Sequence, residues 1–511
     1  MVKRSVFINT VLMVTVIFFS CIPIPYDNEK LECNNLFLVY MAGDNSLNKT
    51  VYEDLEEMKQ GLSTENDIIL VLADRYASDF FEDEWNEARL LEISFTGSQI
   101  QVRELEDNAL GISLEWLDDD IDTGKKETFL NFLRYAENHY SSQNLYLDLW
   151  NHGGGWKSGK AYEGSNIHTA RSICYDEKTK NSLSLKDISS AVKDSGIGHF
   201  DTVLMDACYM GAIEVAAELI ELTDTVIFSQ DAIPEEGMPY NEVIPVLFSK
   251  KAIDEKCQLI CNSYTQNYIT QNVTISAVRI DEGKKMKELV EAFNSSMISL
   301  DSFDTIKNRR NYTSEFFDDV VDMEMLLTDE MKLKYEEVFI KNNSATSSGM
   351  SIYFPEYFSY AKASWEYESE RLSFLKFCPN YLDFLKRFEM AFSSAKMTDN
   401  YEPNNYQIDS FVINSDKKEI ASYLWCTGDE DWYKFELKDE NPVSRLKLYE
   451  PEFIEYNLQV LLYKNGRFID SVNENEQNEL DLSYYDYDEL YVKVYSAFGY
   501  YEQEEKYVLR W

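Results

Sequence analysis

The sequence predicts an α/β protein whose mostly parallel sheet is flanked by helices, followed by an all-β sandwich. Up to about residue 395, short apolar runs alternate with helical patterns, which is typical of parallel strands joined by crossover helices. After about residue 399, apolar and polar residues alternate strictly between turn signals, which is typical of a sandwich. A chain of 511 residues is too long for one ordinary core, so we expect two to four domains.

The chain begins with the pattern of an export signal. Two basic residues precede an apolar run at residues 5–19, which is shorter than the roughly 20 residues that cross a membrane. A small residue then precedes Cys21. This order resembles a bacterial lipoprotein signal, in which Cys21 becomes the lipidated first residue; an ordinary cleaved signal and an uncleaved anchor are the alternatives. We assign residues 1–20 to the signal and residues 21–33 to a tether.

The α/β part follows as strands and helices in alternation. Helices with one apolar face are expected at residues 46–62, 126–140 and 210–222. Strands are expected at residues 36–43, 67–75, 91–95, 100–105, 144–150, 201–207, 224–230, 273–280 and 349–355, of which the third and fourth would form a hairpin. In such a sheet, functional residues collect just past the carboxyl ends of the strands.

The C-terminal part is expected to consist of strands alone. They are predicted at residues 431–437, 445–450, 458–470, 489–496 and 506–511. Asn465 and Gly466 interrupt the longest of these runs, and both residue types accept a positive φ. This pair therefore predicts a tight hairpin between two strands.

Charge and cysteine content narrow the class of function. With 91 acidic and 48 basic residues, the net charge is −43, which disfavours nucleic acid and anionic lipid as partners and favours cationic ones. The acidity also suits a secreted protein that must stay soluble. The eight cysteines show no short-spaced framework. If Cys21 is lipidated, the remaining number is odd, which in an exported protein favours a free thiol.

His152 is the first candidate catalytic residue. The chain has only four histidines, and this one follows a predicted strand in "LYLDLWNHGGGW". Three glycines after it cost backbone entropy, and they make sense where the chain turns tightly beside the imidazole. A glycine loop that carries a structural histidine is the alternative.

Cys208 occupies the matching place after another strand, in "VLMDACYMGAIEVA". A thiol at the start of a helix has a lowered pKa, and a nearby histidine lowers it further. A cysteine–histidine pair can perform nucleophilic catalysis without a metal or cofactor. The alternative is a buried cysteine that only packs, which is the common role of this residue type.

The two motifs together resemble those of the clostripain family of cysteine peptidases. "VYMAGDNSLN", "SQDAIPEEGMPY", "TISAVRID" and "GMSIYFP" resemble further segments of that family, so the resemblance covers residues 34–395. It implies a caspase-like fold, with His152 as general base and Cys208 as nucleophile. The backbone N–H groups of Gly153 and Cys208 would then stabilise the oxyanion. The resemblance implies no cofactor, although some members of the family respond to calcium.

The same resemblance implies cleavage after arginine or lysine. Asp206 matches the family's acidic pocket residue and faces the same side of its strand as Cys208. Asp231 is a second candidate for the pocket, and a turn or cap is the alternative role of Asp206. The family often cleaves itself between its two motifs, and Arg171 and Lys160 are the preferred sites here.

Several further expectations complete the prediction. Two acidic stretches, "EWLDDDID" and "FFDDVVD", could bind calcium, but they lack EF-hand spacing and suit a solvated surface as well. Residues 399–511 resemble the bacterial pre-peptidase C-terminal domain through "DNYEPNN" and "GDEDWYKFEL"; a β-sandwich spacer is the alternative. We expect a monomeric endopeptidase of the cell envelope, either lipid-anchored or secreted. An inactive surface lipoprotein that acts as an adhesin, or another hydrolase built on the same dyad, are the alternative functions.

Overall fold

The structure is a computed structural model. It describes residues 30–75, 85, 87–97, 99–105, 114, 116–117, 121–156, 173–281, 284–300, 320–344, 347–354, 372–396, 401, 404, 407, 410–414, 416–424, 430–437, 443–450, 456–473, 479–495 and 506–511. Within these ranges, no helix combines the length and the apolar character needed to cross a membrane.

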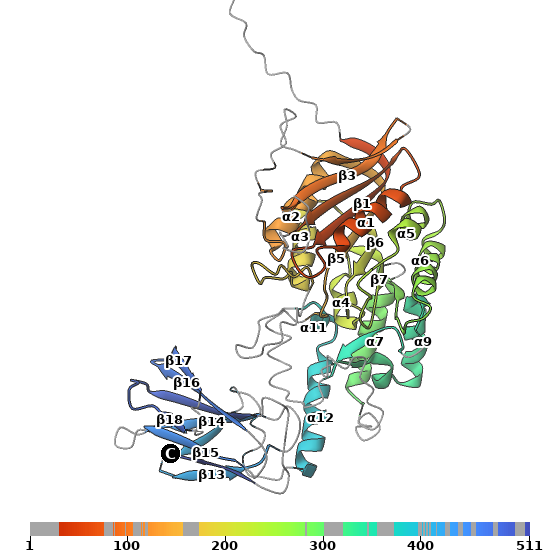
Figure 1. The fold of residues 1–511 in the computed structure, drawn as a ribbon. Coiled ribbons are helices and arrows are strands. Elements are labelled where there is room, and N and C mark those ends of the chain that lie inside the picture. The colour runs from red at the N-terminus through yellow and green to blue at the C-terminus, as the bar shows by residue number, and fades with distance from the viewer. Residues whose placement is uncertain are drawn as a thin grey trace, which may run out of the picture.

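A large twisted sheet forms the centre of the α/β part (Figure 1). Its described strands are β1 (Leu31–Ala42), β2 (Asp67–Asp74), β3 (Arg89–Thr96), β4 (Gln99–Glu104), β5 (Tyr140–Trp150), β6 (Phe200–Asp206), β7 (Thr223–Phe228), β8 (Ser276–Arg279) and β10 (Phe339–Asn342). They lie in the order β10-β8-β7-β6-β5-β1-β2-β3-β4. The strands from β7 to β2 in this order run parallel, and those at both edges run antiparallel. The mostly parallel sheet predicted from the sequence is confirmed.

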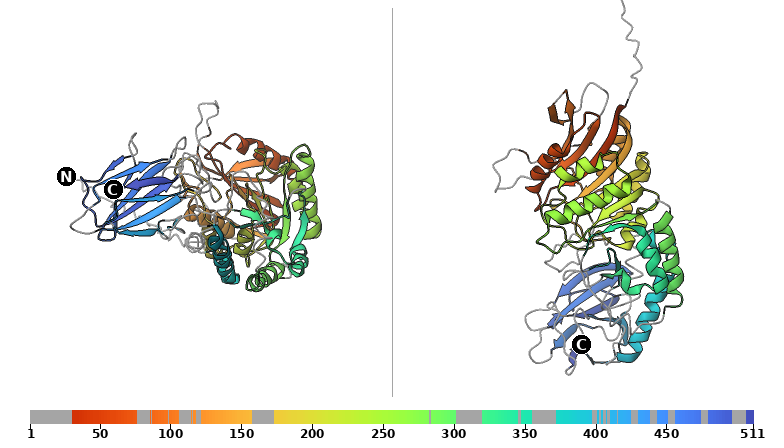
Figure 2. Two further views of the ribbon diagram at one scale, coloured as in Figure 1. Left: turned by 90° about the horizontal axis from the view of Figure 1, so that it is seen from below. Right: turned by 90° about the vertical axis from the view of Figure 1, so that its right-hand side faces the viewer.

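Helices cover both faces of this sheet (Figures 1 and 2). One face carries α1 (Thr50–Gly61), α5 (Tyr240–Leu247) and α6 (Ile253–Asn267). The other carries α2 (Lys126–His139), α3 (Leu185–Ser195), α4 (Ile213–Glu218), α7 (Lys285–Met297) and α9 (Asp329–Val338), and α11 (Phe374–Phe377) and α12 (Asn380–Lys396) pack against α4 and α7. Because successive side chains of a strand point to opposite faces, β1 sends Val39 into one core and Leu38 and Tyr40 into the other.

Two boundaries differ from those predicted. The tether was expected to extend to residue 33, but β1 begins at Leu31, because residues 31–33 pair with the start of β5. The strand predicted at residues 349–355 forms as β11 (Ser351–Tyr353), outside the central sheet. It pairs antiparallel with β9 (Val320–Asp322), a short strand that precedes a 3₁₀ turn and that the sequence pattern did not predict.

The C-terminal part is a separate all-β body beside α12 (Figures 1 and 2). Its strands are β12 (Phe411–Asn414), β13 (Glu419–Ser422), β14 (Glu430–Glu436), β15 (Arg445–Tyr449), β16 (Asn457–Lys464), β17 (Arg467–Asn473), β18 (Glu479–Asp481), β19 (Glu489–Tyr495) and β20 (Tyr507–Arg510). They form two sheets, β12-β14-β19-β16-β17 and β13-β20-β15-β18, around a core of their own. Asn465 and Gly466, at φ 52° and 69°, form the hairpin predicted between β16 and β17.

Candidate active site

The ends of β5 and β6 bring the two candidate catalytic residues together. These strands are parallel neighbours, and Trp150 lies opposite Asp206 in their register. His152 and Cys208 each follow two residues later, in the loops that leave the same edge of the sheet. Parallel strands present their carboxyl ends at one edge, which is where open α/β sheets place their ligand sites.

A cavity of about 340 Å³ opens at this edge. The described residues that line it come from the loop after β1, the ends of β5 and β6, and the loop before α5. They are Ser46, Leu47, Trp150, Asn151, His152, Asp206, Ala207, Cys208, Ile233, Pro234, Glu235 and Gly237. The cavity lining therefore brings a carboxylate and a thiol from the end of β6 together with an imidazole from the end of β5.

Gly153 lies directly against the chain that carries Cys208. A Cβ atom at this position would lie 2.2 Å from the carbonyl oxygen of Cys208 and 2.9 Å from the Cβ of Ala207. Only glycine permits this approach, which explains one glycine of the loop. The backbone N–H of Ile233 donates to the Cys208 sulfur at 3.3 Å, and the thiol lies 3.7 Å from the carbonyl oxygen of the same residue.

The sequence predicted that a helix beginning directly after Cys208 would lower the pKa of its thiol, and the structure differs. Instead of beginning at Met210, α4 begins at Ile213. The preceding residues are tied to the end of β7: Tyr209, at φ 60°, donates to the Asp231 carbonyl and Gly211 donates to the Ser229 carbonyl. Burial raises the pKa of the Cys208 thiol above its usual value, and nearby Asp206 raises it further. The predicted lowering of this pKa by a helix terminus was wrong.

The His152 imidazole has a partner that sequence reasoning did not find. Its Nε2 lies 2.7 Å from the Oγ of Ser46, in the loop that follows β1. Burial lowers the pKa of His152, so near neutral pH the ring is uncharged and can accept a proton. Ser46 thus engages Nε2, while the Cys208 thiol donates to the carbonyl oxygen of Ile233 at 3.7 Å.

We expect Ser46→Ala to lower kcat about two- to tenfold, because a neutral hydrogen bond contributes about 0.5–1.5 kcal/mol to holding its partner. The KM should change little, since the serine would orient the base and not the substrate. Steady-state kinetics on a basic peptide would measure both constants. An unchanged kcat in a folded variant would mean that the Ser46–His152 contact does not position the base.

Asp206 lies below the cavity, with little exposure. Its Oδ2 accepts hydrogen bonds from the backbone N–H of Met238 at 2.8 Å and from the hydroxyl of Tyr240 at 2.9 Å. Gly237, at φ 64°, covers the carboxylate so closely that a Cβ there would lie 2.6 Å from Oδ2. The loop before α5 is thus folded around this carboxylate, which shares the cavity wall with Cys208.

Comparison with known proteins identifies the family. The model of the clostripain family of C11 peptidases matches residues 39–351, more than half of the chain. The chain belongs to the clostripain family. Clostripain from Hathewaya histolytica is 25% identical over 254 residues, which are 46% of this chain and 46% of that protein. The chain thus matches about half the length of clostripain, and it is a relative of cysteine peptidases.

Two solved structures of the same class share the fold. An inactive zymogen C11 protease from Parabacteroides distasonis is 21% identical, with a TM-score of 0.53, and covers 68% of this chain and 98% of its own. A secreted C11 cysteine protease from Bacteroides thetaiotaomicron, in complex with an irreversible peptide inhibitor, is 19% identical, with a TM-score of 0.52. It covers 68% of this chain and 99% of its own. At these identities, the two structures establish the fold of the clostripain-family part.

The other predicted site residues have different placements. Asp231 does not belong to the described lining of the cavity; its Oδ1 accepts the backbone N–H of the next residue, Ala232, at 2.8 Å. Arg171, Lys160 and Cys21 lie outside the described residues. Of the six cysteines that the structure describes, Cys208 is partly exposed and the other five are buried.

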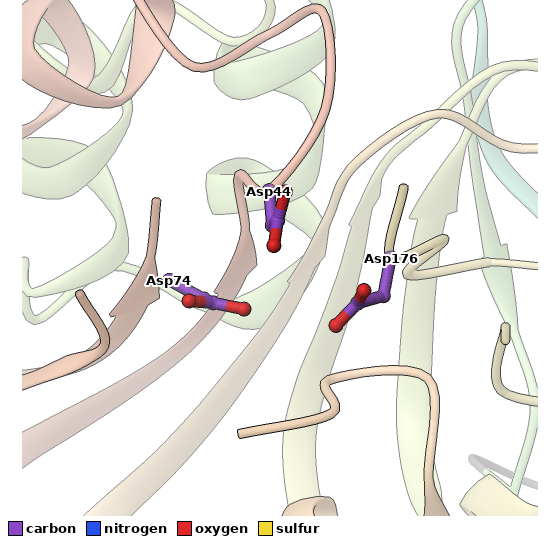
Figure 3. A group of neighbouring side chains, drawn as sticks. All are labelled: Asp44, Asp74 and Asp176. Carbon is purple, nitrogen blue, oxygen red and sulfur yellow. The ribbon is translucent and has the colours of Figure 1, made fainter. Parts of the chain in front are cut away.

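Three buried aspartates form an acidic group at the same edge of the sheet, beside the ends of β1 and β2 (Figure 3). Asp44, Asp74 and Asp176 direct carboxylates toward one another, and one oxygen from each lies within 4.8 Å of the others. Asp176 also accepts hydrogen bonds from the backbone N–H groups of Thr123 at 3.2 Å and Thr179 at 2.8 Å. Carboxylate oxygens are ligands that Ca²⁺ takes, so these residues are the described group that could hold a cation. They lie outside the two acidic stretches considered in the sequence.

Proposed function

We propose that this protein is an exported cysteine endopeptidase that hydrolyses peptide bonds after arginine or lysine. One observation carries the proposal: Cys208, His152 and Asp206 line a single cavity at the carboxyl ends of two neighbouring parallel strands. A nucleophile, a base and a buried anion within reach of one bound peptide are the parts that such a reaction needs. Membership of the clostripain family supports this proposal.

The proposed reaction proceeds through an acyl-enzyme. His152 removes the thiol proton as the Cys208 sulfur attacks the carbonyl carbon, and then gives this proton to the leaving amine as the peptide bond breaks. Water, deprotonated by the same imidazole, releases the acid and restores the thiol. The raised pKa of Cys208 and the lowered pKa of His152 favour a neutral resting pair, so proton transfer accompanies attack. Neither step needs a metal or cofactor.

Backbone groups around the thiol would stabilise the oxyanion. We assign this role to the N–H groups of Gly153 and Cys208, since Gly153 lies directly against the backbone of Cys208. Ile233, whose N–H lies 3.3 Å from the Cys208 sulfur, is an additional donor. Each such donor is typically worth about 3 kcal/mol of transition-state stabilisation.

Turnover of fluorogenic arginine and lysine peptides, with and without added calcium, tests the proposal. The wild type should cleave both, and the Cys208→Ala variant should cleave neither. If a folded wild type cleaves no peptide, with or without calcium, then the inactive lipoprotein becomes the better interpretation. If the dyad acts on another acyl group, then the thiol should react while basic peptides remain intact.

Self-cleavage is expected between the two motifs, with Arg171 as the first site and Lys160 as the second. Purified wild type should therefore separate into two chains on a denaturing gel, whereas Cys208→Ala stays intact because it lacks the nucleophile. N-terminal sequencing of the second chain would identify the site. An active wild type that remains one chain would refute the self-processing part of the proposal.

The proposal also covers the export of the chain and the identity of its C-terminal part. We propose that the chain is anchored in the cell envelope by a lipid on Cys21, and that the sandwich of residues 399–511 is a pre-peptidase C-terminal domain attached to a monomeric peptidase. Intact mass and N-terminal analysis of the mature protein would report the lipid, the signal cleavage and any loss of the sandwich together. A mature chain that retains residues 1–20 would exclude the cleaved lipoprotein signal.

A further inference from the structure

A group of buried acids lies beneath the cavity. Asp54 of α1, Asp148 of β5 and Asp206 of β6 are exposed by 2%, 0% and 4%. In the part of the chain that the structure describes, no lysine, arginine or histidine forms an ion pair with any of them. Several negative charges cannot persist so close together in a buried place, so the group must hold protons or gain a cation.

The hydroxyl of Tyr240 connects two of these acids. It lies 2.5 Å from the Oδ2 of Asp148 and 2.9 Å from the Oδ2 of Asp206. A phenol has one proton and can donate it to only one carboxylate at a time. The other carboxyl group must then carry its own proton and donate it to the phenol oxygen. The two carboxyl groups of Asp148 and Asp206 therefore share one proton, so that one of them is neutral and the other is charged.

The remaining hydrogen bonds indicate which acid keeps the charge. Asp206 also accepts the N–H of Met238 at 2.8 Å, and it is the one of the two that lines the cavity, with 4% of its surface exposed. Asp148 is fully buried, and apart from Tyr240 its hydrogen-bond donors are the backbone N–H of Asp206, at 3.4 Å, and that of Leu149 in its own strand. Charge is most stable where donors and solvent are nearest.

We propose that Asp148 is a protonated positioning residue of the specificity pocket: it donates to Tyr240, which donates to Asp206, so that the pair holds one negative charge and presents it to a basic side chain of the substrate. This inference rests on the proposed function, because it explains how the pocket acid of that peptidase stays charged. It adds Asp148 and Tyr240 to the residues that determine specificity.

The surroundings support this assignment of protons. The ionisable groups that face the pair are Asp54 and Glu57 from α1, Tyr240 from α5, Tyr264 from α6, Tyr268 just after α6, and Cys174 and Cys208 from the loops. None of these groups is a cation. Burial, and then the charge of Asp206, raises the pKa of Asp148 well above its usual range and that of Asp54 to about 9. Burial also raises the pKa of Asp206, though its hydrogen bonds partly offset this.

A pH profile gives a readout that a purely structural role would not change. Two peptides are compared that differ only in lysine or norleucine before the scissile bond, from about pH 5 to about pH 9. In the wild type, the preference for lysine should fall as the pH drops through the raised pKa of Asp206. In Tyr240→Phe and Asp148→Leu, the fall should begin about one pH unit higher, because Asp206 loses support for its charged form.

Asp148→Asn is the conservative variant that separates charge from hydrogen bonding. An asparagine N–H can still donate to Tyr240, as the protonated acid would, so its profile should match that of the wild type. If Asp148→Asn instead loses the lysine preference as completely as Asp206→Asn, then Asp148 carries charge and the proposal is wrong. An unshifted profile in Tyr240→Phe would also overturn it.

A second measurement follows binding to the pocket without turnover. It records how far argininamide slows the alkylation of Cys208 by iodoacetamide. The wild type could turn over no peptide and still be protected by argininamide with the same pH step, and with the same shift in Tyr240→Phe. That result would reject the proposed peptidase and support the pocket assignment. Robust turnover with a lysine preference that is independent of pH would support the peptidase and reject the pocket assignment.

Discussion

Replacing Cys208 with alanine is expected to lower kcat/KM for arginine and lysine peptides by about 10⁴-fold or more, because no other group can form the acyl-enzyme. Cys208 is the partly exposed cysteine among those described, and it shares its cavity with His152. Binding of the peptide should survive, since the pocket acid and the backbone donors remain. Initial rates on a fluorogenic peptide, with a competitive binding measurement on the same preparation, would separate the two effects.

Cys33→Ala is the matched control for this variant. Cys33 lies at the opposite end of the sheet, at the start of β1, where its thiol is buried and is 3.7 Å from the carbonyl oxygen of Ser141. The same loss of a thiol there should leave kcat/KM close to that of the wild type. Turnover that persists in Cys208→Ala and is lost in Cys33→Ala would exclude Cys208 as the nucleophile.

The sequence predicted the parts of the site that lie on strand ends. Apolar runs before His152 and Cys208 located two strands, and parallel strands end at the same edge of a sheet. The structure adds that these strands are adjacent, with Trp150 opposite Asp206. Periodicity cannot give this order, because it depends on which strands pair. The family resemblance, and not the hydrophobic pattern, paired His152 with Cys208 and suggested Asp206 for the pocket.

The residues that sequence reasoning missed act through contacts between distant segments. Ser46 reaches His152 from the loop after another strand, and Tyr240 reaches Asp148 and Asp206 from a helix on the sheet face. Both residues lie in segments that resemble the clostripain family, but the resemblance assigned no role to either of them. The pKa of Cys208 was mispredicted for the same reason. The residues after Cys208 form hydrogen bonds to the segment that follows β7, so α4 begins later than the local pattern indicates.

The Asp206→Asn variant should lose the preference for basic substrates, with kcat/KM for arginine and lysine peptides falling roughly 10²-fold. Asparagine has nearly the same shape, and its Oδ1 can still accept hydrogen bonds from Met238 and Tyr240, so the loss reports the charge. Leaving a buried cation without its partner costs about 2–5 kcal/mol, and each 1.4 kcal/mol is about tenfold. A norleucine peptide should lose far less, because its side chain brings no charge into the pocket.

Asp231→Asn makes the same chemical change at the other acid that the sequence suggested for the pocket. Asp231 lies outside the described cavity lining, where it accepts the N–H of Ala232, so its variant should keep the lysine preference. Thermal unfolding provides a second check. Because the pKa of Asp206 is raised in the folded protein, folding stability falls as the pH rises from about 4 through that raised pKa. Asp206→Asn should remove this contribution and unfold at an equal or higher temperature near neutral pH. A lysine preference that survives in Asp206→Asn and disappears in Asp231→Asn would place the specificity acid at residue 231.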